Sequence, residues 1–207
     1  MRDGDATAVA DHWEGVYAEK RPDEVGWYEP SPERSLALIR AAGLGPDAGI
    51  IDVGGGASRL AQHLVEAGHS DVTVADIARA SLERAREGVG DAVEWVVADV
   101  RDHDFGRSFD LWHDRAVFHF MAEADDRSAY LRTLRRSLGP GGFVVIATFG
   151  PDGPDRCSGL PVQRYGADEL AGALGEDFRV VESGLAQHTT PSGKPQQFLH
   201  LVAQRTR

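Results

Sequence analysis

The sequence is poor in cysteine and lysine, and it has no long apolar run. Cys157 is the only cysteine, so the chain can form no internal disulfide and no cysteine-based metal site. Only Lys20 and Lys194 are lysines among 22 basic residues, and 33 acidic residues give a formal net charge of -11, which argues against nucleic acid as a partner. No signal-peptide pattern and no membrane-length segment is found, so we expect a soluble, cytoplasmic protein with no membrane partner.

Short apolar runs alternate with amphipathic ones from residue 50 onward. The strand-like runs are 50–54, 72–77, 93–100, 109–113 and 143–149, and the helix-like runs between them are 57–67, 79–87 and 125–138. This alternation predicts an α/β fold whose parallel sheet is covered on both faces. After a helix at 166–174, the runs 178–188 and 196–205 predict an antiparallel pair that closes the sheet. The length of 207 residues suits a single domain, 1–207.

Two helices are predicted ahead of the first strand. The stretch 8–19 reads as a short helix. In "SPERSLALIRAAG", Ser31 is placed to cap a second helix, with Pro32 at its first position and Gly43 just past its end.

Three glycines, Gly54–Gly56, follow the first predicted strand in "IIDVGGGASRL" and precede a helix. In a doubly wound sheet the ligand lies beyond the carboxyl ends of the strands, and glycines there let the backbone approach it closely. The triplet alone also fits a purely structural turn. A nicotinamide or flavin fingerprint needs a third glycine where Arg59 stands. Asp52 would sit badly beside a pyrophosphate, but it suits a cofactor with a cationic amino-acid moiety and no phosphate.

Two further carboxylates end the next two predicted strands. Asp76 lies 20 residues after Gly56, where an acid accepts hydrogen bonds from ribose hydroxyls. Asp99 ends the third strand, where it can accept from the exocyclic amine of an adenine held between Ile77 and Val100. Each aspartate alone could be an ordinary capping residue, but three carboxylates at three consecutive strand ends indicate a nucleoside site.

At this point the chain resembles the class I S-adenosylmethionine-dependent methyltransferases, over about residues 35–205. The resemblance is carried by "IDVGGGAS", the acid of "VADI", the strand end "ADV", the segment "LGPGGFVVIATF" and the final antiparallel pair. It implies a Rossmann-like, doubly wound, seven-stranded, mostly parallel sheet with a C-terminal antiparallel strand. It also implies S-adenosyl-L-methionine as cofactor and S-adenosyl-L-homocysteine as product. Carried over by position, the cofactor-binding residues are Asp52, Gly54, Gly56, Asp76, Ile77, Asp99, Val100 and His113.

In this family the segment after the fourth strand, here "WHDRAVFHF", faces the methyl group. Asp114 and His119 are therefore the candidate catalytic residues, either of which could remove a proton from the nucleophile. Asp114–Arg115 could equally be a structural ion pair, and His119 a buried core histidine. No convincing metal ligand set is found, so direct in-line displacement without a metal is expected.

The N-terminal stretch 12–39 is similar to the leading segment of two branches of the superfamily. One contains the thiopurine- and tellurite-type methyltransferases, and the other contains the elongation-factor lysine methyltransferases. The similarity implies a helical lid over residues 1–30, ahead of a Rossmann-like core over 31–207. In it Trp13 would contact the cofactor, and Tyr17 and Trp27 the substrate, although such aromatics could also simply anchor the helix.

The remaining substrate-binding candidates are Arg115 and two residues of the Gly- and Pro-rich loop 150–165, Arg164 and Tyr165. Cys157, in the same loop, is interpreted as structural or incidental. The predicted function is methyl transfer to a small-molecule thiol, chalcogen or amine, and a protein lysine methyltransferase is the alternative. A nicotinamide-dependent oxidoreductase and a non-catalytic binding module are the competing classes, and the oligomeric state stays open.

Overall fold

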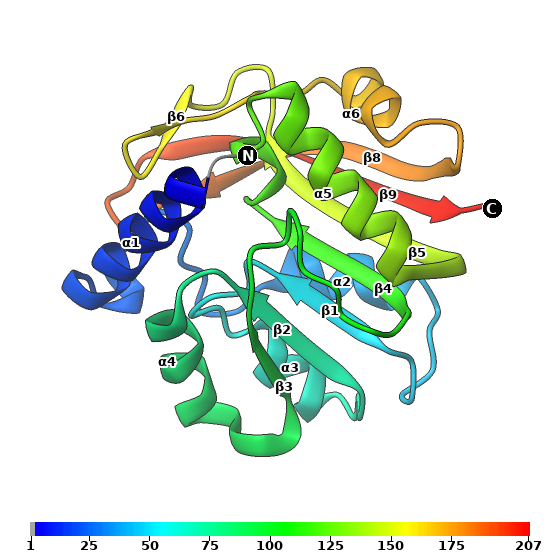
Figure 1. Cartoon of the computed structure of the whole chain (residues 1–207), viewed down its shortest axis with the longest axis horizontal. Coiled ribbons are helices and arrows are strands. Elements are labelled where there is room, and N and C mark those ends of the chain that lie inside the picture. Colours follow the sequence, from blue (N-terminus) through cyan, green and yellow to red (C-terminus); the bar gives the residue numbers. More distant parts are fainter. Residues whose placement is uncertain (1–2) are drawn as a thin grey trace.

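A computed structural model describes residues 3–207, and it contains one large sheet with helices on both faces (Figure 1). The helices are α1 (Asp3–Glu19), α2 (Glu33–Ala41), α3 (Leu60–Glu66), α4 (Arg79–Val89), α5 (Ala124–Ser137) and α6 (Ala167–Leu174). The strands are β1 (Ile50–Val53), β2 (Val72–Asp76), β3 (Glu94–Val97), β4 (Phe109–Arg115), β5 (Leu138–Phe149), β6 (Arg156–Cys157), β7 (Leu160–Pro161), β8 (Phe178–Thr189) and β9 (Pro195–Arg205). Short 3-10 turns cover Pro22–Glu24, Gly90–Ala92 and Phe118–Phe120.

The main sheet has the order β3-β2-β1-β4-β5-β9-β8, and the pair β6-β7 forms a separate small hairpin. The neighbours from β3 to β5 pair in parallel, whereas β9 is antiparallel to both β5 and β8. The predicted seven-stranded, mostly parallel sheet with an antiparallel C-terminal strand is thereby confirmed. Since the strand order reverses between β1 and β4, the ligand position of a doubly wound sheet lies beyond their carboxyl ends.

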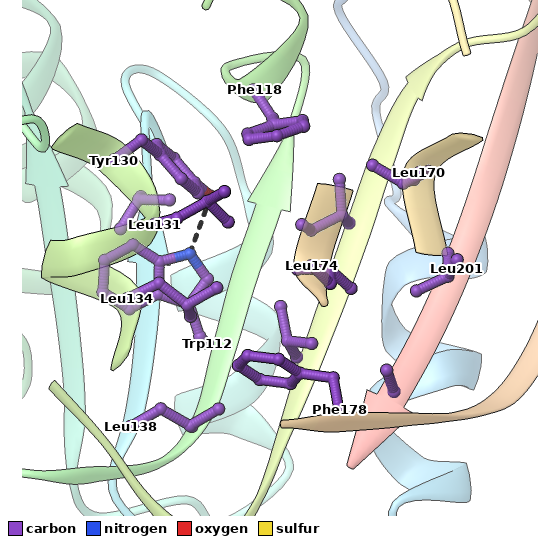
Figure 2. Packing of buried hydrophobic residues seen from close by; sticks show 14 of the residues in the cluster. Trp112, Phe118, Tyr130, Leu131, Leu134, Leu138, Leu170, Leu174, Phe178 and Leu201 are labelled. Carbon is purple, nitrogen blue, oxygen red and sulfur yellow. Dashed lines mark hydrogen bonds between the residues drawn. The ribbon is translucent and has the colours of Figure 1, made fainter. Parts of the chain in front are cut away.

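Alternation along each strand divides the core between the two faces of the sheet. On β1, Ile51 and Val53 belong to one buried cluster and Ile50 to the other. The first cluster is covered by α5 and α6, and the second by α2, α3 and α4. Figure 2 shows the first cluster, in which Trp112 of β4 packs against α5 and donates a hydrogen bond of 2.8 Å from its Nε1 to the hydroxyl of Tyr130.

Several boundaries differ from the sequence prediction: α1 begins at Asp3 and not at residue 8, and β3 ends at Val97, so Asp99 lies in the loop after it. Helix α2 begins at Glu33 with Pro32 before it, and the Ser31 hydroxyl donates to the Glu33 carboxylate (2.6 Å) instead of capping the helix backbone. Strand β5 begins at Leu138, five residues earlier than predicted, because its first residues continue the pairing with Phe109 of β4. Within residues 3–207, no helix is long and apolar enough to cross a membrane.

Candidate functional site

A cavity of about 320 Å³ lies at the carboxyl ends of the parallel strands, between the sheet and the N-terminal segment. Residues from β1 to β4 and the loops after them form its floor, α1 and Trp27 cover it, and the β6–β7 hairpin closes one side. The lining residues used below are Trp13, Tyr17, Trp27, Gly54, Asp76, Ile77, Asp99, Val100, Arg101, Arg115, Val117, Phe120, Met121, Glu123, Asp126, Cys157, Leu160 and Pro161.

The glycine loop forms a tight wall that side chains could not replace. Gly54 and Gly56 have positive φ angles, 62° and 47°, which disfavour residues with a Cβ. A Cβ on Gly54 would overlap the side chain of Val117. A Cβ on Gly56 would lie 2.7 Å from the Tyr17 hydroxyl and 3.0 Å from the Asp76 Oδ2. The loop therefore brings bare backbone up to the cavity beside a carboxylate.

Asp76 ends β2 at the cavity wall, where it starts helix α4. Its Oδ1 accepts the N–H of Ala78 (2.8 Å), and the side chain is otherwise enclosed by protein. Burial raises the pKa of Asp76 to about 7, and the negative charge of Asp52 adds to that effect. A ligand that donates hydrogen bonds to this carboxylate would favour its ionised form.

Asp99 is held in place by an arginine that follows it by two residues. Arg101 forms a bidentate ion pair with Asp99, with Nη2–Oδ2 at 2.6 Å and Nε–Oδ1 at 2.9 Å. Its Nη1 also reaches Asp126 on α5 (3.1 Å). The pairing fixes the Asp99 carboxylate at the cavity wall beside Val100.

Helix α1 and the segment after it place aromatic rings over the cavity. Trp13 packs edge-on against Trp27 (5.7 Å between centroids) and Phe120 (5.3 Å), and Tyr17 packs against Trp27 (6.2 Å). Glu14 anchors the helix, because its carboxylate accepts the first two backbone N–H groups of α4, from Arg79 (2.6 Å) and from Ala80 (3.1 Å). The cover is thus tied to the same helix end as Asp76.

Arg115 ends β4 at the junction of two cavities. Its Nη1 donates to the Trp27 carbonyl (2.8 Å), its Nη2 pairs with Glu29 (2.9 Å), and its guanidinium lies 5.4 Å from the ring centre of Phe198. Glu29 in turn pairs with His188 of β8 (3.4 Å). The segment carrying Trp27 is therefore held to the sheet by charge.

A smaller cavity, about 50 Å³, lies behind the glycine loop and shares Gly54, Trp27 and Arg115 with the larger one. Three of its lining side chains form a buried hydrogen-bonded chain. His113 Nδ1 lies 2.7 Å from Asp52 Oδ1, and His113 Nε2 lies 2.9 Å from Ser35 Oγ.

Residues 50–142 match the family model described as "Methyltransferase domain". Over this region the chain is similar to the class I S-adenosylmethionine-dependent methyltransferases, whose members use S-adenosylmethionine as methyl donor. The match supports the predicted resemblance and the cofactor that the resemblance implies.

Curated relatives of this chain match in part. A malonyl-[acyl-carrier protein] O-methyltransferase of Anoxybacillus flavithermus is 28% identical over 107 residues, which are 51% of this chain and 40% of that protein. The chain thus spans about two-fifths of that relative's length. EEF1A lysine methyltransferase 2 of Danio rerio is 26% identical over 156 residues, 67% of each chain.

A solved structure shares the fold over the whole chain. It is the 1,6-didemethyltoxoflavin-N1-methyltransferase of Burkholderia thailandensis, determined with 1,6-didemethyltoxoflavin and S-adenosylhomocysteine bound. It has a TM-score of 0.77, covers 100% of this chain and 91% of its own, and is 24% identical.

The structure brings most of the predicted cofactor and lid residues of the methyltransferase together. Trp13, Tyr17, Trp27, Gly54, Asp76, Ile77, Asp99, Val100 and Arg115 all line the larger cavity. Gly56 lies beneath the Tyr17 hydroxyl beside Asp76, and Asp52 and His113 line the smaller cavity. Within residues 3–207, no group of three or more His, Cys, Asp or Glu side chains could hold a metal ion.

The two catalytic candidates require correction, because neither lines either cavity. Asp114 is fully buried and accepts from the Tyr130 hydroxyl (2.5 Å) and from the N–H groups of Val117 (2.9 Å) and Phe118 (3.0 Å). It therefore holds the turn after β4 and forms no ion pair with its neighbour. His119 is also fully buried, and burial lowers its pKa to about 3. It is an uncharged core residue.

Two substrate candidates in the loop after β5 also require correction. Arg164 donates to the carbonyl of Gly153 and does not line the larger cavity. Tyr165 is buried in the first core cluster, against Phe118 (5.5 Å between ring centroids). The loop instead reaches the cavity through the hairpin residues Cys157, Leu160 and Pro161.

Sequence reasoning also missed the anchors Glu14, Glu29, Ser35 and Arg101. The position of Arg101, two residues after Asp99, could have indicated its role, because an arginine there can form a bidentate ion pair with that carboxylate. Glu14 gave no such signal, since its partners lie 65 and 66 residues away in the sequence.

Proposed function

We propose that the chain is an S-adenosylmethionine-dependent methyltransferase that acts on a small molecule. The observation that supports this best is the cavity of about 320 Å³ at the carboxyl edge of the sheet, under an aromatic cover held in place by Glu14. Its volume is in the range of small-ligand sites. An acceptor within it must fit beside the cofactor, beneath Trp13 and Trp27.

The residues present fit the cofactor. Gly54 presents bare backbone to the cavity, since a Cβ there would overlap Val117, and the buried Asp76 carboxylate offers acceptor atoms to the ribose hydroxyls. Asp99 would accept from the adenine amine, with Ile77 and Val100 against the ring. Asp52 would lie near the methionine amino group, from the smaller cavity that Gly54 joins to the larger one. When bound, S-adenosylmethionine supplies an electrophilic methyl group on a cationic sulfur.

The protein's own contribution is to bind, orient and exclude water. Trp13 and Tyr17 close the cavity, and their aromatic faces attract a cation by about 0.5–2 kcal/mol. The buried position of Tyr17 keeps its hydroxyl protonated, since burial raises the pKa of that group. Positioning and desolvation are then the main sources of rate enhancement, without a metal.

A protein lysine methyltransferase is the second candidate. It is favoured by the relative EEF1A lysine methyltransferase 2, which this chain matches over 67% of both proteins.

Transfer of a labelled methyl group separates the two candidates. The protein is incubated with methyl-labelled S-adenosylmethionine and either a deproteinised small-molecule extract or a protein fraction, and volatile products are trapped. We expect label in the soluble or volatile pool. Label confined to acid-precipitable protein would support the lysine candidate and overturn the proposal.

A further inference from the structure

The part of the larger cavity left for the acceptor is mostly apolar, and Arg115 is its one cation outside the Arg101 ion-pair cluster. Once the residues proposed for the cofactor are set aside, the apolar lining includes Phe120, Met121, Leu160 and Pro161. The polar lining consists of Cys157, Arg115, Glu123 and the pair Arg101–Asp126. This inference rests on the proposed function, because it assigns the acceptor to the space beside the cofactor.

No buried side chain in that space offers a free base to the acceptor. Among the described residues that line the cavity there is no histidine. Asp99 and Asp126 are paired with Arg101, and Asp76 is proposed to hold the ribose. Burial raises the pKa of the Cys157 thiol to about 11, so this group stays protonated. Glu123 is exposed to solvent at the start of α5.

Among the described residues, not every N–H donor of the Arg115 guanidinium has an acceptor. A guanidinium carries five N–H donors. Nη1 donates to the Trp27 carbonyl, whereas Nη2, although 2.9 Å from the Glu29 carboxylate, has no hydrogen-bond partner among the described residues. The Glu29 carboxylate also lies 3.4 Å from His188. The side chain of Arg115 is only 17% exposed and lines both cavities, so an anion that reached its free donors would be bound in a poorly hydrated setting.

We propose that the acceptor is an organic anion with an apolar body, whose reacting atom is already deprotonated in solution, and that Arg115 determines this specificity. The acceptor's lone pair forms the bond to the methyl carbon while the carbon–sulfur bond breaks and its electron pair stays on sulfur. The negative and positive charges cancel, both products are neutral at the reacting atoms, and no proton is released. A protonated amine would need a base, and beyond the paired and cofactor-assigned carboxylates this space offers only the solvent-exposed Glu123.

The test uses a charge series of similar ring compounds: benzoate, 4-nitrophenolate and 4-nitrothiophenolate as anions, and benzylamine as the cation. Each is titrated into the wild-type protein saturated with S-adenosylhomocysteine, and binding is followed by calorimetry at pH 8. At least one anion is expected to bind at least tenfold more tightly than benzylamine. Benzylamine binding as tightly as the best anion would overturn the inference.

Variants locate the effect. Arg115→Gln is expected to weaken binding of the best anion at least tenfold, Arg115→Lys to recover part of it, and Arg164→Gln, whose arginine lies outside the cavity, to leave it unchanged. Unchanged anion binding in a folded Arg115→Gln variant would contradict the role of Arg115.

Turnover of any bound anion should release no proton, as measured with a pH indicator in weakly buffered solution. Release of one proton per methyl group transferred would contradict the proposal. If wild-type protein fails to bind S-adenosylhomocysteine, the proposed function itself fails.

Discussion

Affinity for S-adenosylhomocysteine should rise with pH between 6 and 8, because of Asp76. Burial raises the pKa of this carboxyl to about 7 in the free protein, so near pH 6 it is mostly protonated. Ribose hydroxyls donate hydrogen bonds and are held better by the ionised form. Binding must therefore expel the proton at low pH, and that cost disappears above pH 7.

The size of the effect follows from the fraction ionised. A group that titrates near pH 7 is about one-eleventh ionised at pH 6 and about ten-elevenths ionised at pH 8. If only the ionised form binds well, affinity rises about tenfold, or about 1.4 kcal/mol, over these two pH units. Tyr17, whose hydroxyl packs against Gly56 beside the Asp76 carboxylate, stays protonated throughout this range because its own pKa is raised by burial.

Isothermal titration of S-adenosylhomocysteine at several pH values checks this prediction. Asp76→Asn removes the ionisable group and should give weaker binding, by about 1.5–3 kcal/mol at pH 8, with a flat pH profile. Asp125→Asn, an exposed carboxylate in the first turn of α5, is the matched control and should behave like the wild type. A flat wild-type profile would refute the assignment of Asp76 to the ribose.

Three further predictions concern the cover and the core. Glu14→Ala removes the acceptor for the first N–H groups of α4, so S-adenosylhomocysteine should dissociate faster and bind about 1 kcal/mol more weakly. The exposed Glu19→Ala is the control and should change neither the dissociation rate nor the affinity. Stopped-flow tryptophan fluorescence measures the dissociation rate. Trp112→Ala leaves a hole beneath α5 and should lower the free energy of unfolding by about 3–5 kcal/mol in urea titrations. Tyr130→Phe leaves the Trp112 N–H and the Asp114 carboxylate without their shared partner, and should cost about 1–3 kcal/mol in the same assay; an unchanged midpoint would refute that hydrogen-bond chain.

The cavity floor was predictable because it depends on strand ends. Parallel strands place their carboxyl ends at one edge of the sheet, so Asp76, Asp99 and Gly54 meet wherever the sheet forms. The alternation of apolar runs and helices was enough to predict that sheet, including its antiparallel last strand.

The residues after β4 show what the sequence could not decide. Position near a strand end does not tell which way a side chain turns once the strand has ended. The Asp114 side chain points into the core beneath α5, and a short 3-10 turn buries His119 beside Phe149. Burial of these two groups became visible only with the packing of α5 and β5 around them.

Longer-range placements were beyond sequence reasoning for a different reason. The loop 150–165 was expected at the cavity, and part of it is there, but the hairpin folds Cys157 and Leu160 inward while Tyr165 joins the core. Glu14 reaches α4 only because α1 lies across that helix end (Figure 1). Contacts between residues far apart in the sequence depend on the tertiary structure and cannot be predicted from local sequence patterns.

The most direct test of the central claim is a titration of S-adenosylhomocysteine into the wild-type protein, with NAD titrated in parallel. The account predicts saturable binding of one S-adenosylhomocysteine per chain and no binding of NAD. It also predicts weaker binding in Asp76→Asn, a substitution of nearly equal size that should leave the fold intact. Absence of S-adenosylhomocysteine binding by the wild type, or a preference for NAD, would contradict the account.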